Sequence, residues 1–138
     1  MRLIIALILL SAGVSGFAFD KDKYYYGHFF VYEKAEIFES SEGGLVAYLI
    51  PGGYDELYDV PAAILVEGVI SDETVTHLRR LLSRDKDVRD FFLDSPGGFL
   101  SAGMRLGKML SDLGARATIP QGGECFSACA LAFLGGKD

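Results

Sequence analysis

The sequence contains no tryptophan, and only two cysteines and two histidines occur among its 138 residues. Two cysteines cannot hold a zinc ion alone, and only His28 and His77 are available to complete such a site. An excess of basic residues is also missing, because 13 lysines and arginines stand against 19 aspartates and glutamates. The formal net charge of −6 argues against a nucleic-acid-binding protein, which usually has a basic face. We therefore expect no metal ion, no cofactor and no nucleic acid as ligands.

Low-complexity tracts and internal repeats are also missing, and half of the residues are hydrophobic. This composition and length are typical of one folded domain with an ordinary core. The longest apolar run begins directly after Met1 and Arg2, and Gly16-Phe17-Ala18 fits the small-residue rule for signal-peptide cleavage. We predict a signal peptide over residues 1–18 and an exported protein, periplasmic or extracellular. If the segment is not removed, residues 3–19 would instead anchor the chain in a membrane.

Residues 19–60 form an aromatic-rich segment. Two β-favouring runs, residues 29–32 and 45–50, are separated by a serine- and glycine-rich stretch at residues 40–44. The pattern predicts a hairpin or a pair of edge strands. The tyrosines of this segment would suit a ligand site, but packing is the more common role of such residues.

From residue 61 onward, predicted strands and helices alternate. Strands are expected at residues 62–66, 88–93 and 115–119, and helices at residues 72–84, 100–113 and 127–134. Ser71 suits the N-cap of the first helix, and Gly103 and Gly107 lie one turn apart in the second, which indicates close packing there. The order predicts an α/β fold with a parallel sheet of βαβ units over residues 61–138.

Two predicted strand-to-helix turns carry the candidate chemistry, since sites in parallel sheets form beyond the carboxyl ends of strands. The first is Ser95-Pro96-Gly97-Gly98, which we expect to end the second strand and to leave backbone N–H groups uncovered. The second is Ser127, where a loop enters a helix of small residues and the helix dipole favours negative charge. Taken separately, the first is also explained as a plain turn and Ser127 as an N-cap.

The two turns together, at this order and spacing, resemble the Clp protease proteolytic subunit family of the Clp/crotonase superfamily. The similarity includes the run from Ser95 to Met104, then Gly123-x-x-x-Ser127 with its small-residue helix, and extends back to Leu65-x-x-Gly68-x-Ile70. It covers residues 64–136, roughly half of the chain. The resemblance implies a Clp/crotonase-like sheet of ββα and βαβ units, incomplete at the C-terminus because the family continues beyond the nucleophile helix. The signal peptide suggests an exported branch.

The resemblance also implies roles for individual residues. Ser127 would be the nucleophile of peptide-bond hydrolysis through an acyl-enzyme, and Gly98 and Ala128 would supply the oxyanion N–H groups. Gly97, Phe99 and Leu100 would contact the substrate, with the backbone of residues 98–100 pairing with an extended peptide. The partners implied are a peptide or protein substrate and other copies of the chain, as in a homo-oligomer.

A serine nucleophile needs a base, and no residue here matches the family's histidine or aspartate. His28, His77 and Lys137 are poor substitutes, because each is better explained by packing or exposure. The chain is therefore either a fragment of a longer serine peptidase or a shortened relative that binds peptides or assembles with a partner. In either case little or no peptidase activity is expected from these residues alone. A crotonase-type enzyme acting on an acyl thioester is a third hypothesis.

Cys125 and Cys129 flank Ser127 and are close enough in sequence to form a disulfide across the turn. Two buried thiols are the alternative. An exported protein favours the bond, because disulfides persist outside the reducing cytosol.

Overall fold

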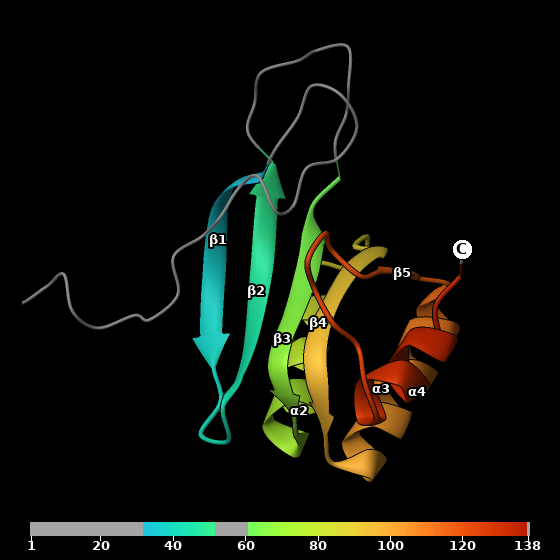
Figure 1. Ribbon diagram of the computed structural model, residues 1–138. Helices are drawn as coiled ribbons and strands as arrows, with labels where there is room; N and C mark the ends of the chain where they lie inside the picture. Colours follow the sequence, from blue (N-terminus) through green and yellow to red (C-terminus); the bar gives the residue numbers. More distant parts are fainter. Residues whose placement is uncertain (1–31, 52–60, 138) are drawn as a thin grey trace, which may run out of the picture.

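The alternating strands and helices are present in the computed structural model, which describes residues 32–51 and 61–137 (Figure 1). The described residues form an α/β fold with a five-stranded mixed sheet in the order β1-β2-β3-β4-β5 and three helices, α2, α3 and α4. The predicted signal peptide, His28, and the aromatic residues before Tyr32 and at positions 54 and 58 lie outside the described residues.

Strands β1 (Tyr32–Glu39) and β2 (Gly44–Pro51) form the predicted hairpin. Residues 29–31 of the first predicted run lie outside the described residues, and Tyr32, its last residue, is the first residue of β1. The prediction did not include the rest of β1, which at the edge of the described sheet exposes Glu36 and Glu39. Charged side chains on an edge strand discourage pairing with other chains.

The other strands follow the predicted pattern. β3 (Ala63–Ile70), α2 (Asp72–Arg84) and β4 (Asp90–Gly98) form one βαβ unit, and β4, α3 (Leu100–Leu113) and β5 (Arg116–Thr118) form the second. β3, β4 and β5 pair in parallel, as predicted for residues 61–138, whereas β2 pairs antiparallel with both β1 and β3, so the sheet as a whole is mixed. The tight turn between β1 and β2 permits only antiparallel pairing, whereas parallel neighbours need a helical crossover.

Helix α2 begins as predicted after Ser71, which forms a capping box with Thr74. The Ser71 amide donates to the Thr74 hydroxyl at 3.1 Å, and Thr74 returns a longer bond from its own amide. The buried side of the helix carries Val75, Leu78 and Leu81. The imidazole of His77 stacks on the ring of Phe38 in β1, with 4.1 Å between ring centroids. His77 is therefore a packed residue that ties α2 to the hairpin.

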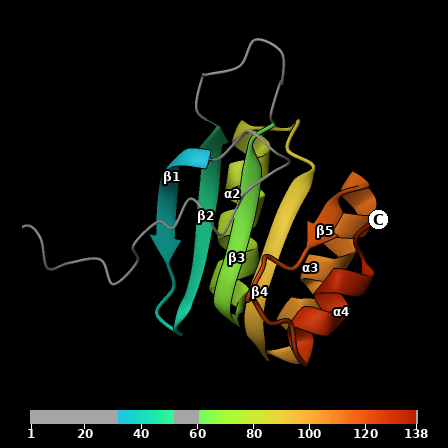
Figure 2. The ribbon, with the colours of Figure 1, turned by 45° about the horizontal axis from the view of Figure 1, so that its top comes forward.

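The core has two parts, one on each face of the sheet. The larger part joins the strands to α2, α3 and α4, which lie on one side of the sheet in both views (Figures 1 and 2). Its largest fully buried members include Ile64, Phe91, Leu93, Leu106 and Leu110. The smaller part comprises Leu45, Ala47, Leu49, Ala63, Leu65 and Phe92.

Helix α4 (Ala128–Leu134) packs closely on α3 (Figure 2). A Cβ atom added to Gly103 would lie 2.8 Å from the Cβ of Ala128, and one added to Gly107 would lie 2.8 Å from the carbonyl oxygen of Leu131. The predicted close packing at these two glycines is confirmed. Within residues 32–51 and 61–137, no helix is long and apolar enough to span a membrane.

Candidate active site around Ser127

The Ser-Pro-Gly-Gly motif lies inside strand β4. The prediction that it breaks the strand is wrong, because Gly97 and Gly98 pair with Val69 and Ile70 of β3. The register of the β3–β4 pair shifts within this segment. Two residues separate the paired positions Glu67 and Val69 in β3, whereas three separate their partners, positions 94 and 97, in β4. A β-bulge with one extra residue in β4 explains this shift and gives Pro96 a place where a missing N–H is tolerated.

Ser95 connects β4 to the loop that precedes Ser127. Its amide donates to the carbonyl of Glu124 at 2.7 Å, and its carbonyl accepts from the amide of Phe126 at 3.1 Å. Its hydroxyl is completely buried and accepts from the amide of Gly97 at 3.0 Å. Sequence reasoning does not identify this role, because the partners come from a loop much later in the chain.

These contacts bring the two predicted motifs together. A Cβ atom added to Gly97 would lie 2.9 Å from the Cβ of Ser127, 3.0 Å from the carbonyl oxygen of Phe126 and 3.4 Å from the amide nitrogen of Ala128. Gly97 also has a φ of +118°, a value that side-chain-bearing residues rarely adopt. Glycine is therefore required at position 97 by both space and backbone conformation.

Ser127 has an unusual backbone conformation, with φ 53° and ψ −120°. Among the described residues it is the sole non-glycine residue with a positive φ. Its hydroxyl makes no capping hydrogen bond to α4, so the interpretation of Ser127 as a simple N-cap fails. The residue is exposed to solvent. Strained and exposed residues of this kind cluster at active sites, where the surrounding structure holds them in place.

The amide of Ala128 is the first of α4 and has no earlier helical carbonyl to bind. Within the described part of the chain, it makes no hydrogen bond to a backbone carbonyl outside the helix. α4 has seven residues, close to the predicted 127–134, and is too short for its dipole to be the main source of positive potential, so this amide is the relevant donor. Gly98 lies beside Ile70 of β3 at the end of β4, with no room for a side chain.

The backbone of Phe99 is already hydrogen-bonded within the protein, so the expected pairing of a peptide with residues 98–100 stays a prediction for the rest of that segment. The Phe99 amide donates to the carbonyl of Ile70 at 2.9 Å, its carbonyl accepts from the amide of Gly103, and Leu100 already begins α3. What these residues offer is their side chains, which are 50% and 61% exposed. Phe126, next to Ser127, is also 61% exposed. Exposed apolar side chains therefore occur on both of the segments that meet at Gly97 and Ser127.

Neither of the described candidates for a base lies near Ser127. His77 packs on β1, whereas the Ser127 loop is bound to β4, three strand spacings or about 14 Å away. Burial, followed by the charges of Arg80 and Arg84, lowers the pKa of His77 below its usual value of 6.5. Lys137 follows the opposite end of α4, and its amide donates to the carbonyl of Ala115. No side chain among the described residues forms a hydrogen bond with the Ser127 hydroxyl.

Cys125 and Cys129 form a disulfide, with 5.1 Å between their α-carbons. The bond spans Ser127 and connects its loop to the first turn of α4. The prediction that favoured the disulfide over two free thiols is confirmed.

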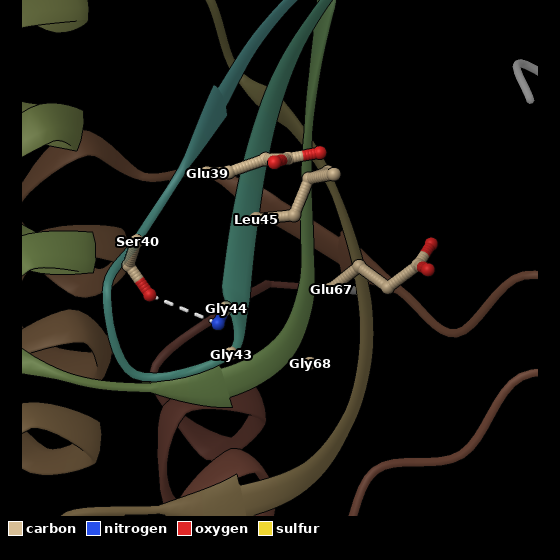
Figure 3. A pocket seen from close by; sticks show the side chains of 7 residues that line it. All are labelled: Glu39, Ser40, Gly43, Gly44, Leu45, Glu67 and Gly68. Carbon is tan, nitrogen blue, oxygen red and sulfur yellow. Dashed lines mark hydrogen bonds between the residues drawn. The ribbon is translucent and has the colours of Figure 1, made fainter. Parts of the chain in front are cut away.

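A second candidate site lies at the tip of the β1–β2 hairpin (Figure 3). This open cavity of about 270 Å³ is lined by the two carboxylates of Glu39 and Glu67, by Leu45 and by a stretch of glycine backbone. Its serine, Ser40, closes the turn by accepting a hydrogen bond from the Gly44 amide at 2.9 Å. Ser40 therefore stabilises the turn, and we assign this cavity a structural role and not a catalytic one.

Comparison of the chain with models of protein families, with curated proteins and with solved structures finds no match. The described residues also contain no group of three histidine, cysteine, aspartate or glutamate side chains placed to hold a metal ion. The geometry around Ser127 is therefore the main indication of what this protein does.

Proposed function

We propose that this chain carries the nucleophile and oxyanion site of a serine peptidase. The observation that carries the proposal is the backbone of Ser127, strained at φ 53° and directed against Gly97 in the bulged end of β4. The order of the two motifs and their resemblance to the Clp protease proteolytic subunit family support the same assignment. A Clp/crotonase-like core is part of the proposal.

In this proposal the Ser127 oxygen attacks the carbonyl carbon of a peptide bond and loses its proton to a base. The negative charge that develops on the carbonyl oxygen is bound by the N–H groups of Gly98 and Ala128. Because neighbouring amides of an extended strand point to opposite edges, and the Phe99 amide binds β3, we expect the Gly98 amide to point away from β3. The amine leaves with a proton, and water then hydrolyses the acyl-enzyme.

The exposed side chains of Phe99, Leu100 and Phe126 support a peptide substrate that places apolar residues beside the scissile bond. A residue outside the described ranges, or another polypeptide, would supply the base. The disulfide supports an exported protein, since such bonds persist in oxidising compartments.

A second candidate function is peptide binding without catalysis. It is favoured by the distance of His77 and Lys137 from Ser127 within the described part of the chain. Such a protein would keep the strained turn and the apolar side chains but would not activate the hydroxyl.

A fluorophosphonate probe separates the two functions, because it reacts with activated serines. The protein expressed in full and in its oxidised form should be labelled, and Ser127→Ala should reduce labelling to background. Ser111→Ala, which removes an exposed serine near the other end of α3, is the matched control and should be labelled like the parent. Labelling that survives in Ser127→Ala contradicts the proposal. Binding of an apolar peptide without any labelling would establish the second function.

A further inference from the structure

The Ser127 turn is enclosed by a covalent ring. The disulfide joins positions 125 and 129, so the chain segment that it closes has Ser127 at its centre. No other cysteine occurs in the sequence. A dithiol reductant therefore acts on this one bond, and any effect of reduction on the protein originates at the Ser127 turn.

The two ends of the disulfide differ in burial. Cys129 is fully buried in the core between the sheet and the helices, whereas Cys125 is half-buried in the loop. Cys129 is thus the fixed end of the ring, and Cys125 is the end that a reductant reaches and that moves when the bond opens.

Apart from the disulfide, hydrogen bonds hold the two sides of the turn, and in the described part of the chain one long bond, at the carbonyl, reaches Ser127 itself. Upstream, Glu124 and Phe126 are bound to Ser95. Downstream, the Cys129 amide donates to the carbonyl of Phe126 at 3.0 Å, and the Leu131 amide donates to that of Ser127 at 3.3 Å. A non-glycine residue at φ 53° persists only where its surroundings over-determine it. The disulfide supplies a constraint across this residue.

We infer that the Cys125–Cys129 disulfide positions Ser127 and makes the site redox-dependent, active when oxidised and weakened when reduced. The inference rests on the proposed function for its effect on reactivity, but its structural part is independent of it. The reductant is a small or protein dithiol. One thiolate attacks the Cys125 sulfur, and the Cys129 thiolate leaves and takes up a proton. The second thiol then resolves the mixed disulfide, which leaves the dithiol oxidised by two electrons and both cysteines as thiols.

Opening the ring should let Ser127 relax toward ordinary backbone angles. The strained form would then be a minor state, and the apparent reactivity falls by the fraction that remains competent. We expect the maximal rate of fluorophosphonate labelling to fall about tenfold, which corresponds to about 1.4 kcal/mol. The concentration of probe at half-maximal rate should stay the same, because Phe99 and Leu100 keep their positions at the N-cap and first residue of α3.

The test compares the oxidised protein, the protein treated with a dithiol, and the same sample after reoxidation. Labelling rates and amide hydrogen exchange are measured on each. The double variant Cys125→Ser/Cys129→Ser is the control, because it should behave like the reduced protein and ignore the reductant. Exchange in residues 124–130 should rise on reduction, whereas exchange in α2, on a different part of the sheet, should not change.

Each outcome addresses one claim. Faster exchange at residues 124–130 with a lower labelling rate, both restored by reoxidation, supports the inference. Unchanged exchange and unchanged labelling on reduction overturn it, whether or not the double variant folds. Faster exchange with no labelling in any state would leave the disulfide as the element that holds the turn and would contradict the proposed peptidase.

Discussion

Two loops of this molecule each contain a residue with a positive φ, but the residue type differs between them. In the hairpin turn at positions 40–44, the residue with a positive φ is Gly43. Gly68 of β3 lies against this turn and also has a positive φ (Figure 3). In the loop before α4, the residue with a positive φ is Ser127. Glycine adopts such angles without steric cost, whereas serine does not. A serine at a position where glycine would carry no strain supports the chemical role proposed for Ser127, whereas the hairpin glycines have a structural role.

The loops also differ in what holds them. The hairpin turn has a closing bond of its own, with the Ser40 amide donating to the Gly44 carbonyl at 2.8 Å, and Ser41 also donates to Glu73 of α2. The Ser127 loop depends on Ser95 in β4 and on the disulfide, both outside the residue that carries the strain. The Ser127 loop should respond more strongly to changes in its supports, because its residue with a positive φ is not a glycine.

The largest contrast should come from Gly97→Ala compared with Gly43→Ala. At position 97 the new methyl group would meet the Ser127 Cβ at 2.9 Å on a backbone at φ +118°, so we expect a loss of about 3 kcal/mol in the free energy of unfolding. At position 43 the methyl group would lie 3.8 Å from a Val69 methyl, and the cost is the backbone strain alone, about 1 kcal/mol.

Urea denaturation monitored by circular dichroism measures both variants. Labelling by the fluorophosphonate should be lost in Gly97→Ala under native conditions and kept in Gly43→Ala. Equal destabilisation of the two variants would remove the distinction between the loops.

A smaller effect of opposite sign is expected for Ser127→Gly. Glycine relieves the strain at φ 53°, and part of that gain is offset by the greater freedom of glycine in the unfolded chain. The free energy of unfolding should rise by about 0.5 kcal/mol, while Ser127→Ala, which keeps a Cβ, should leave it unchanged. Both variants should lose labelling. If Ser127→Gly proves less stable than Ser127→Ala, the conformation of Ser127 is not strained.

The smallest effect is a pH dependence of the free energy of unfolding, and it comes from His77, which packs against the hairpin. The pKa of His77 lies below 6.5 in the folded protein, mainly through burial, so the unfolded chain binds more protons in the range just below pH 6.5. The free energy of unfolding should therefore decrease as the pH falls through that range. His77→Gln should remove this slope in urea denaturation series.

Glu73 adds a separate pH dependence of the free energy of unfolding, at lower pH. Hydrogen bonds from Ser41 lower its pKa below the usual 4.5, so its contribution is present above pH 4.5 and is lost as the pH falls further. Glu73→Gln should remove the decrease in the free energy of unfolding below pH 4.5 and leave the decrease near pH 6 unchanged. A slope near pH 6 that persists in His77→Gln would contradict the role assigned to the histidine.

Much of the α/β part was predictable because its signals are local. Ser71 caps α2 as expected, and α3 and α4 end near Gly114 and Gly135. Gly103 and Gly107 correctly indicated a close helix contact. Periodicity, caps and glycines act within a few residues, so they can be read from the sequence alone.

The errors occur where distant segments decide the structure. β4 continues through Pro96 because β3 supplies a partner for Gly97 and Gly98, which the motif itself does not reveal. The backbone of Phe99 is used by Ile70 and Gly103 and is not free for a peptide. Gly97 was correctly grouped with Ser127, but the strain of Ser127 and the buried hydroxyl of Ser95 follow from tertiary contacts.

Because α3 and α4 are in close contact, substitutions in α3 should also affect the site around Ser127. Gly103 contributes no group to the proposed chemistry, yet a methyl group there would press on Ala128, whose amide is a proposed oxyanion donor. Variants of α3 that keep its helical character should therefore alter the reaction without contacting the substrate. In directed evolution of this protein, the small residues of α3 belong with Ser127 among the positions that set its rate.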